Sequence, residues 1–128
     1  MDASTLLDAQ VQTKRIYGLL NEAMELSRQM AEAMDRDDQV AIQMLVSMRE
    51  EPVRKLRQAR QALEGQRDAL EPETARRLSQ LLNGEAAETE AEAPLAAQVG
   101  TNRRLLEQLL DLDRVLNRKL TREESIYK

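Results

Sequence analysis

"IYGLLNEAMELSRQMAEAMDRDD", residues 16–38, decides the fold, because it joins a long helical apolar seam to a polar turn. The seam steps by four and three residues, as in a helix that packs lengthwise on a near-antiparallel neighbour. Its members are Ile16, Leu20, Ala23, Ser27, Met30 and Met34. Thr5 and Asp8 have capping-box spacing, which predicts that this helix begins near residue 5 and runs to about Met34.

The acidic turn at 35–38 is expected to start a second helix, capped by Asp37 or Asp38, that runs to about Leu70. Its predicted apolar stripe consists of Ile42, Val46, Val53, Leu56, Leu63 and Leu70. Pro52 lies inside this helix and removes one backbone donor, so we expect either a kink or a break into two helices. Two helices of this length predict a long antiparallel hairpin with arms of about 45 Å.

The rest of the chain adds two more predicted helices and one linker. Residues 71–84 read as a short helix, with Pro72 in the first turn and Asn83-Gly84 as a left-handed cap. Residues 85–94 carry Glu and Ala without a large apolar side chain, which predicts a flexible acidic linker. The last helix is expected from about Leu95 to Leu120. The predicted fold is therefore all-α, a single helical domain over residues 1–128 in which the last helix lies along the hairpin.

The composition argues against several classes of function. The 128 residues include no cysteine and no histidine, which leaves no thiolate and no imidazole for catalysis or metal binding. Because no Ser, Lys, Asp or Glu has a supporting motif, we expect no enzyme, no cofactor and no metal. A net charge of −4 and 2% aromatic residues argue against nucleic acid as the main partner. No signal peptide or membrane span is recognisable, so we expect a cytoplasmic location.

The last predicted helix carries two apolar seams about 100° apart. The first consists of Leu105, Leu109, Leu112 and Leu116, and the second of Leu95, Val99, Leu106 and Leu110. The second seam continues as Asp113 and Asn117, so it becomes polar halfway along the helix. Burial between two neighbouring helices would explain a broad stripe of this kind. The alternative is that part of the second seam, Leu106 and Leu110 above all, docks a partner helix.

Two further features have both an ordinary and a functional interpretation. Five methionines cluster around the first turn: Met24, Met30, Met34, Met44 and Met48. Adaptable binding surfaces use methionine, but core filling is the favoured interpretation, because Met30, Met34 and Met44 fit the predicted buried stripes. In the polar tail, Ile126 and Tyr127 could anchor either to the bundle or to a partner.

Three stretches carry a resemblance to a known family: "YGLLNEAMELSRQMAEAMDRDD", then "VAIQMLVSMREEPVRKL", and later "NRRLLEQLL". They resemble bacterial flagellar export chaperones of the FlgN and FliT type, and Asn102, Leu105 and Leu106 are similar to the Asn-x-x-Leu-Leu stretch of FlgN-like members. The resemblance implies a helical protein that binds hook-associated or filament-cap subunits and delivers them to the export apparatus. It also implies partner binding through the C-terminal helix. With the second seam included, the expected partner-binding residues are Leu95, Val99, Asn102, Leu105, Leu106, Leu109, Leu110 and Leu112.

Two hypotheses follow, and both are non-catalytic. The first is an export chaperone that masks an apolar assembly helix of its client. The second is a structural or regulatory coiled-coil protein whose last helix mediates self-association, for instance as a homodimer.

Overall fold

A computed structural model of the chain describes the backbone of residues 1–127 and the side chains of residues 1–120. Within that part the fold is all-α, with four helices and no strand. They are α1 (Ala3–Asp35), α2 (Gln39–Asp68), α3 (Pro72–Leu82) and α4 (Ala93–Tyr127). The predicted fold class is confirmed. The segment 121–127 continues α4, whereas we expected a tail there.

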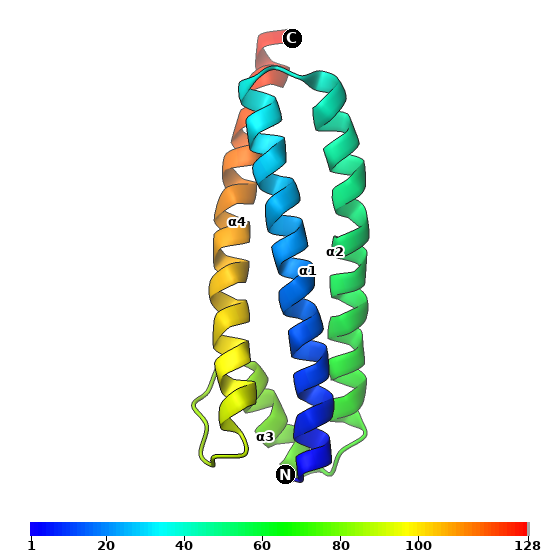
Figure 1. Cartoon of the computed structure of the whole chain (residues 1–128), viewed down its shortest axis with the longest axis vertical. Helices are drawn as coiled ribbons and strands as arrows, with labels where there is room; N and C mark the ends of the chain where they lie inside the picture. Colours follow the sequence, from blue (N-terminus) through cyan, green and yellow to red (C-terminus); the bar gives the residue numbers. More distant parts are fainter. Residues whose placement is uncertain (128) are drawn as a thin grey trace.

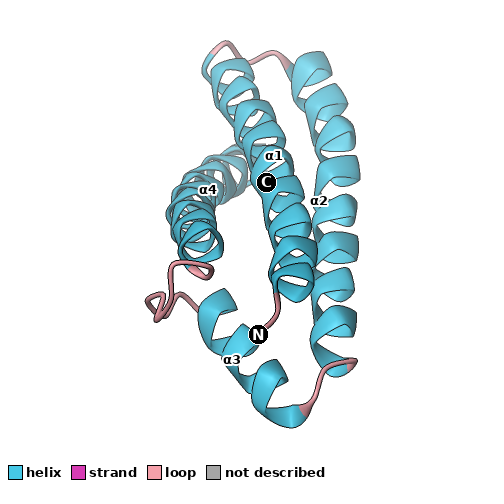
Figure 2. Ribbon diagram, turned by 60° about the horizontal axis from the view of Figure 1, so that its bottom comes forward, coloured by secondary structure: helices cyan, strands magenta, loops and turns pink. Residues whose placement is uncertain are grey.

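The three long helices lie side by side with α1 in the middle (Figures 1 and 2). α2 runs antiparallel to α1 as the second arm of the hairpin, and α4 runs parallel to α1 on its other side (Figure 1). α3 crosses the foot of the bundle, near the N-terminus (Figure 2). α2 and α4 both pack on α1, but no Cα atoms of α2 and α4 come within 8 Å of each other among the described residues.

The helix ends follow local capping chemistry, with one correction. α1 begins earlier than predicted, because the Asp2 carboxylate accepts a hydrogen bond from the Thr5 backbone N–H at 2.8 Å and is the N-cap. Asp38 caps α2 in the same way through the Ala41 N–H. Gly84 adopts φ +97° just after α3, which confirms the left-handed cap.

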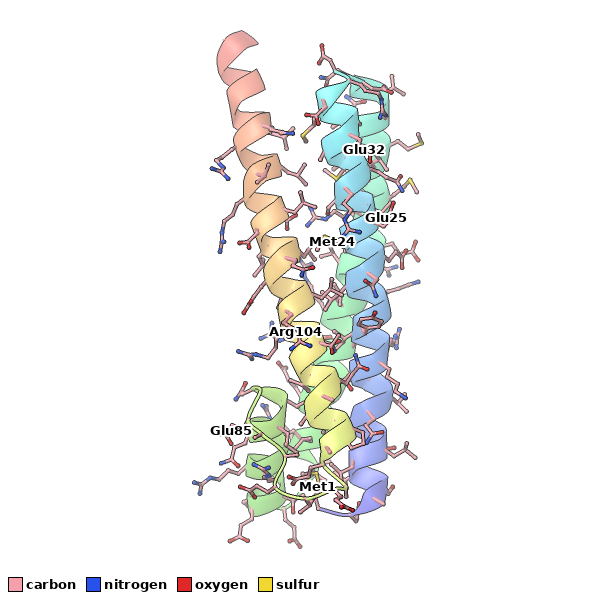
Figure 3. The ribbon with its side chains drawn as sticks, turned by 60° about the vertical axis from the view of Figure 1, so that its left-hand side comes forward. Met1, Met24, Glu25, Glu32, Glu85 and Arg104 are labelled. Carbon is pink, nitrogen blue, oxygen red and sulfur yellow. The ribbon has the colours of Figure 1, made fainter. Side chains whose placement is uncertain are left out.

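The core consists of three apolar clusters stacked along α1. The seam predicted for α1 is confirmed: Ile16 is half-buried and its other members are buried. Met24, labelled in Figure 3, belongs to the middle cluster with Leu109 of α4. The upper cluster joins Met34, Ile42 and Leu116, one from each long helix.

The stripe predicted for α2 needs correction at Val46 and Pro52. Val46 is 42% exposed, while Leu45, Pro52 and Ala59 are buried beside the predicted Ile42 and Leu63. α2 is continuous through Pro52, which excludes a break into two helices, one of the two alternatives that we expected here. Packing of the proline ring against the bundle offsets part of the cost of the lost backbone hydrogen bond.

Candidate partner-binding site

The first seam of α4 faces α1. Leu109 and Leu116 are buried at 5% and 2% exposure, and Leu105 and Leu112 pack half-buried against the same clusters. These four leucines hold α4 in the bundle. A partner would reach Leu109 and Leu116 only if α4 moved away from α1.

The second seam divides into a buried and an exposed half. Leu95 and Val99 are buried at the foot, where Leu78 and Leu81 of α3 pack on them. Leu106 and Leu110 remain 43% and 46% exposed. The division lies where α3 ends, since α3 covers only the lowest turns of α4. The exposed half of the seam is therefore the accessible part of the predicted site.

Leu106 lies on the wall of a groove between α2 and α4. α1 forms the floor through Thr13, Ile16 and Leu20, and the end of α3 closes the foot. The groove has a volume of about 530 Å³. Its apolar lining consists of Ile16, Leu20, Val53, Leu56, Leu63, Leu82, Val99 and Leu106. A concave, mostly apolar surface of this kind is suited to an amphipathic helix.

The charged groups of the groove are mainly arginines. Arg57, Arg60 and Arg67 lie along the α2 wall, and Arg103 lies on the α4 wall. Glu64 is the single acid among the lining residues, and it pairs with Arg60 at 3.7 Å. The groove is thus basic, although the chain as a whole carries a net charge of −4.

An ion pair bridges α2 and α4 above the groove. Arg49 Nη2 donates to Asp113 Oδ2 at 2.6 Å, and the two side chains are 23% and 25% exposed. Arg49 Nε and Asp113 Oδ1 are buried without a hydrogen-bond partner. Asp113 is the residue at which the second seam turns polar, and its contact explains that change: the seam faces α2, and here it meets an arginine.

Asn102 has a structural contact in addition to its predicted role. The residue is 8% exposed, and its Nδ2 donates to the Thr13 backbone carbonyl at 2.8 Å. Its Oδ1 accepts from Gln98 Nε2 at 3.0 Å. Both ends of the amide are therefore engaged, and Asn102 fixes α4 on α1 at the floor of the groove.

The acidic segment 85–92 is held to α3 by one arginine. Arg77 donates from Nη2 to Glu92 Oε1 at 2.7 Å and from Nε to Glu92 Oε2 at 3.1 Å. It also donates to the Ala86 carbonyl, and the Glu88 backbone N–H donates to Glu92. Figure 3 shows the loop at Glu85 lying beside α3. The segment is non-helical, as predicted, but a flexible linker would have to break these contacts.

The Arg77 contact strongly favours the ionised form of Glu92. The hydrogen bond from Arg77, followed by that from the Glu88 N–H, lowers the pKa of Glu92 from 4.5 to about 2. Sequence reasoning missed this pair, because a segment without apolar side chains offers nothing to bury. The available signal was the position of Glu92 directly before the start of α4, where a carboxylate is favoured by the positive end of the helix dipole.

A second exposed apolar stripe lies on α2, away from the groove. Val40, Met44 and Met48 are 76%, 58% and 51% exposed. Our assignment of Met44 to the core is wrong, since α2 buries the neighbouring Ile42 and Leu45 instead. Met24, Met30 and Met34 are buried as core filling requires. The side chains of Ile126 and Tyr127 lie outside the described residues.

Residues 1–127 contain no helix that is both long and apolar enough to cross a membrane. The described residues also include no cluster of acidic side chains that could hold a metal ion. Comparison with protein-family models, curated proteins and solved structures finds no match to this chain.

Proposed function

We propose that this protein is a non-enzymatic, helix-binding chaperone of the flagellar export type, with hook-associated or filament-cap subunits as clients. The observation that carries the proposal is the open apolar groove between α2 and α4, with the exposed Leu106 on its wall. Leu110 extends the same face one turn further. The resemblance of "NRRLLEQLL" to FlgN-like members supplies the client class.

The mechanism is mass action. A client assembly helix that lies in the groove cannot join another subunit, so the chaperone lowers the free client concentration until the export apparatus takes over. The proposal requires no chemistry beyond burial of apolar surface, which contributes about 25 cal/mol per Å². Delivery to the export apparatus in the cytoplasm belongs to the same proposal.

The test is the double substitution Leu106→Glu and Leu110→Glu, compared with Met44→Glu and Met48→Glu. Both variants place two glutamates one turn apart at exposed apolar positions, but only the first affects the groove face. Each is used as bait in a pull-down from a lysate of flagellated bacteria, with mass spectrometry of the recovered proteins. Circular dichroism measures helicity and the thermal midpoint.

We expect wild type and the methionine variant to recover a hook-associated or cap protein, and the leucine variant to lose it while it keeps its helicity. Recovery of no such protein by wild type would contradict the proposal. Loss of the fold in the leucine variant would place these leucines in the core. Dissociation of a homodimer, with no client bound, would favour self-association through the last helix.

A further inference from the structure

The groove between α2 and α4 lies where a fourth long helix could pack on the three long helices. α1 contacts both neighbours, while α2 and α4 stay apart, so between them α1 presents the half-buried Ile16, with the buried Thr13 and Leu20 beside it. On α2 the lining runs from Val53 to Arg67, which corresponds to about 21 Å, or four helical turns. α3 reaches only the foot of the groove, through Leu82 and Asn83. One helix of about four turns fits the free length.

The charges of the groove define what kind of helix this is. Arg57 lies on the α2 wall and Arg103 on the α4 wall, and neither has an ion-pair partner within residues 1–120. Among the residues whose side chains are described, Arg67 pairs with its neighbour Asp68 alone, and the Asp68 side chain is 70% exposed. The chain carries a net charge of −4, so its surface outside the groove would repel an acidic helix. The arginines beside the apolar floor therefore make the groove the place where an acidic helix can bind.

We propose that the groove binds a single amphipathic helix of another protein whose apolar stripe is flanked on both sides by aspartate or glutamate. The stripe covers the half-buried Ile16 and Leu56 and the exposed Leu106, and the flanking carboxylates pair with Arg57 on one wall and Arg103 on the other. Apolar burial supplies most of the affinity, while the arginines reject basic helices and fix the orientation. This inference rests on the proposed function for the use of the groove as a client site, and it adds the chemistry of the client.

The Arg103 wall is itself positioned by the fold. A Cβ atom at Gly84 would lie 3.1 Å from Arg103 Cδ and Nε, so the guanidinium stem packs directly over the glycine that ends α3. The left-handed cap of α3 therefore leaves room for the arginine beside the groove.

Two synthetic peptides of about 18 residues test the inference. Both carry leucines at i, i+3, i+4 and i+7 spacing; one has glutamate at every flanking position and the other has lysine. Their dissociation constants for the full chain are measured by fluorescence anisotropy at low and high salt. The groove variant is Arg57→Glu with Arg103→Glu. The control is Arg15→Glu with Arg76→Glu, which makes the same charge change at exposed positions outside the groove.

We expect the acidic peptide to bind wild type at least tenfold more tightly than the basic one, with the preference shrinking at high salt. The groove variant should lose or reverse the preference, and the control should keep it. Equal binding of the two peptides, no binding of either, or a preference that survives in the groove variant would overturn the inference. A homodimer that occupies the groove and excludes both peptides would also overturn it.

The outcome is separable from that of the proposed function. Selective binding of the acidic peptide without recovery of a hook-associated or cap protein would support the groove chemistry and contradict the flagellar client. Recovery of such a client without any charge preference would support the flagellar client and contradict the groove chemistry.

Discussion

Replacing Glu92 with glutamine removes the carboxylate that joins the acidic loop to α3. In the folded chain the pKa of Glu92 is lowered from 4.5 to about 2, chiefly by hydrogen bonds from Arg77. A difference of about 2.5 pKa units corresponds to an upper bound of about 3 kcal/mol in the free energy of unfolding. Glutamine still accepts one hydrogen bond, and Arg77 keeps the nearby Glu85 and Glu88. We therefore expect a loss of about 1.5 to 2 kcal/mol at pH 7.

The loss should depend on pH in a defined direction. Because the pKa is lower in the folded chain than in the unfolded one, the ion pair stabilises the fold fully above about pH 5 and loses this effect as the pH falls toward 2. The difference between wild type and Glu92→Gln should shrink by about half at pH 3.

Urea denaturation followed by circular dichroism at pH 7, 5, 4 and 3 measures both quantities. Glu90→Gln is the matched control, since Glu90 is exposed in the same loop and its side chain has no ion pair among the described residues. A difference at pH 7 below about 0.5 kcal/mol, or one that does not change with pH, would refute the reasoning.

Three further substitutions test the packing that shapes the groove, each by urea denaturation. Asn102→Ala removes the hydrogen bond from the side chain to the Thr13 carbonyl and should cost about 1 to 2 kcal/mol; a cost no larger than that of Gln108→Ala, at an exposed position of the same helix, would contradict this. Leu78→Ala removes a fully buried side chain at the foot and should cost about 2 to 5 kcal/mol, and an unchanged midpoint would show that α3 is not docked. Gly84→Ala forces a left-handed backbone and crowds Arg103, so we expect a cost of at least about 1 kcal/mol, and a neutral effect would argue against the cap.

The main features of the fold were predictable from periodicity and caps. The four-and-three steps from Ile16 to Met34 predicted the central helix, and Asp38 and Gly84 marked helix ends through chemistry that depends only on the local sequence. The N-cap Asp2 was missed, because Asp2 and Thr5 each carry a side-chain oxygen that could cap the helix. Only the backbone geometry selects Asp2. The effect of Pro52 on α2 could not be predicted for a different reason, since burial against the bundle decides whether a helix tolerates proline.

Of the candidate partner-binding site, only the exposed face of α4 was predictable from the sequence. The spacing on α4 placed Leu106 and Leu110 on a different side from Leu109 and Leu116, and the structure separates them in the same way. The spacing could not show that α3 would cover Leu95 and Val99, because that contact depends on how a short helix crosses the foot of the bundle. The groove and its arginines arise from three helices together, so no single periodic pattern contains them.

The most direct test of the central claim is photo-crosslinking from the groove in living cells. A photoreactive amino acid at position 106 is compared with the same residue at position 44, which is exposed but lies away from the groove. The crosslinked partner from flagellated bacteria is identified by mass spectrometry of the joined peptides. We predict a crosslink from position 106, absent from position 44, to an acidic amphipathic helix of a hook-associated or cap protein. Crosslinks from position 106 only to a second copy of the chain, or equal crosslinks from both positions, would contradict the account.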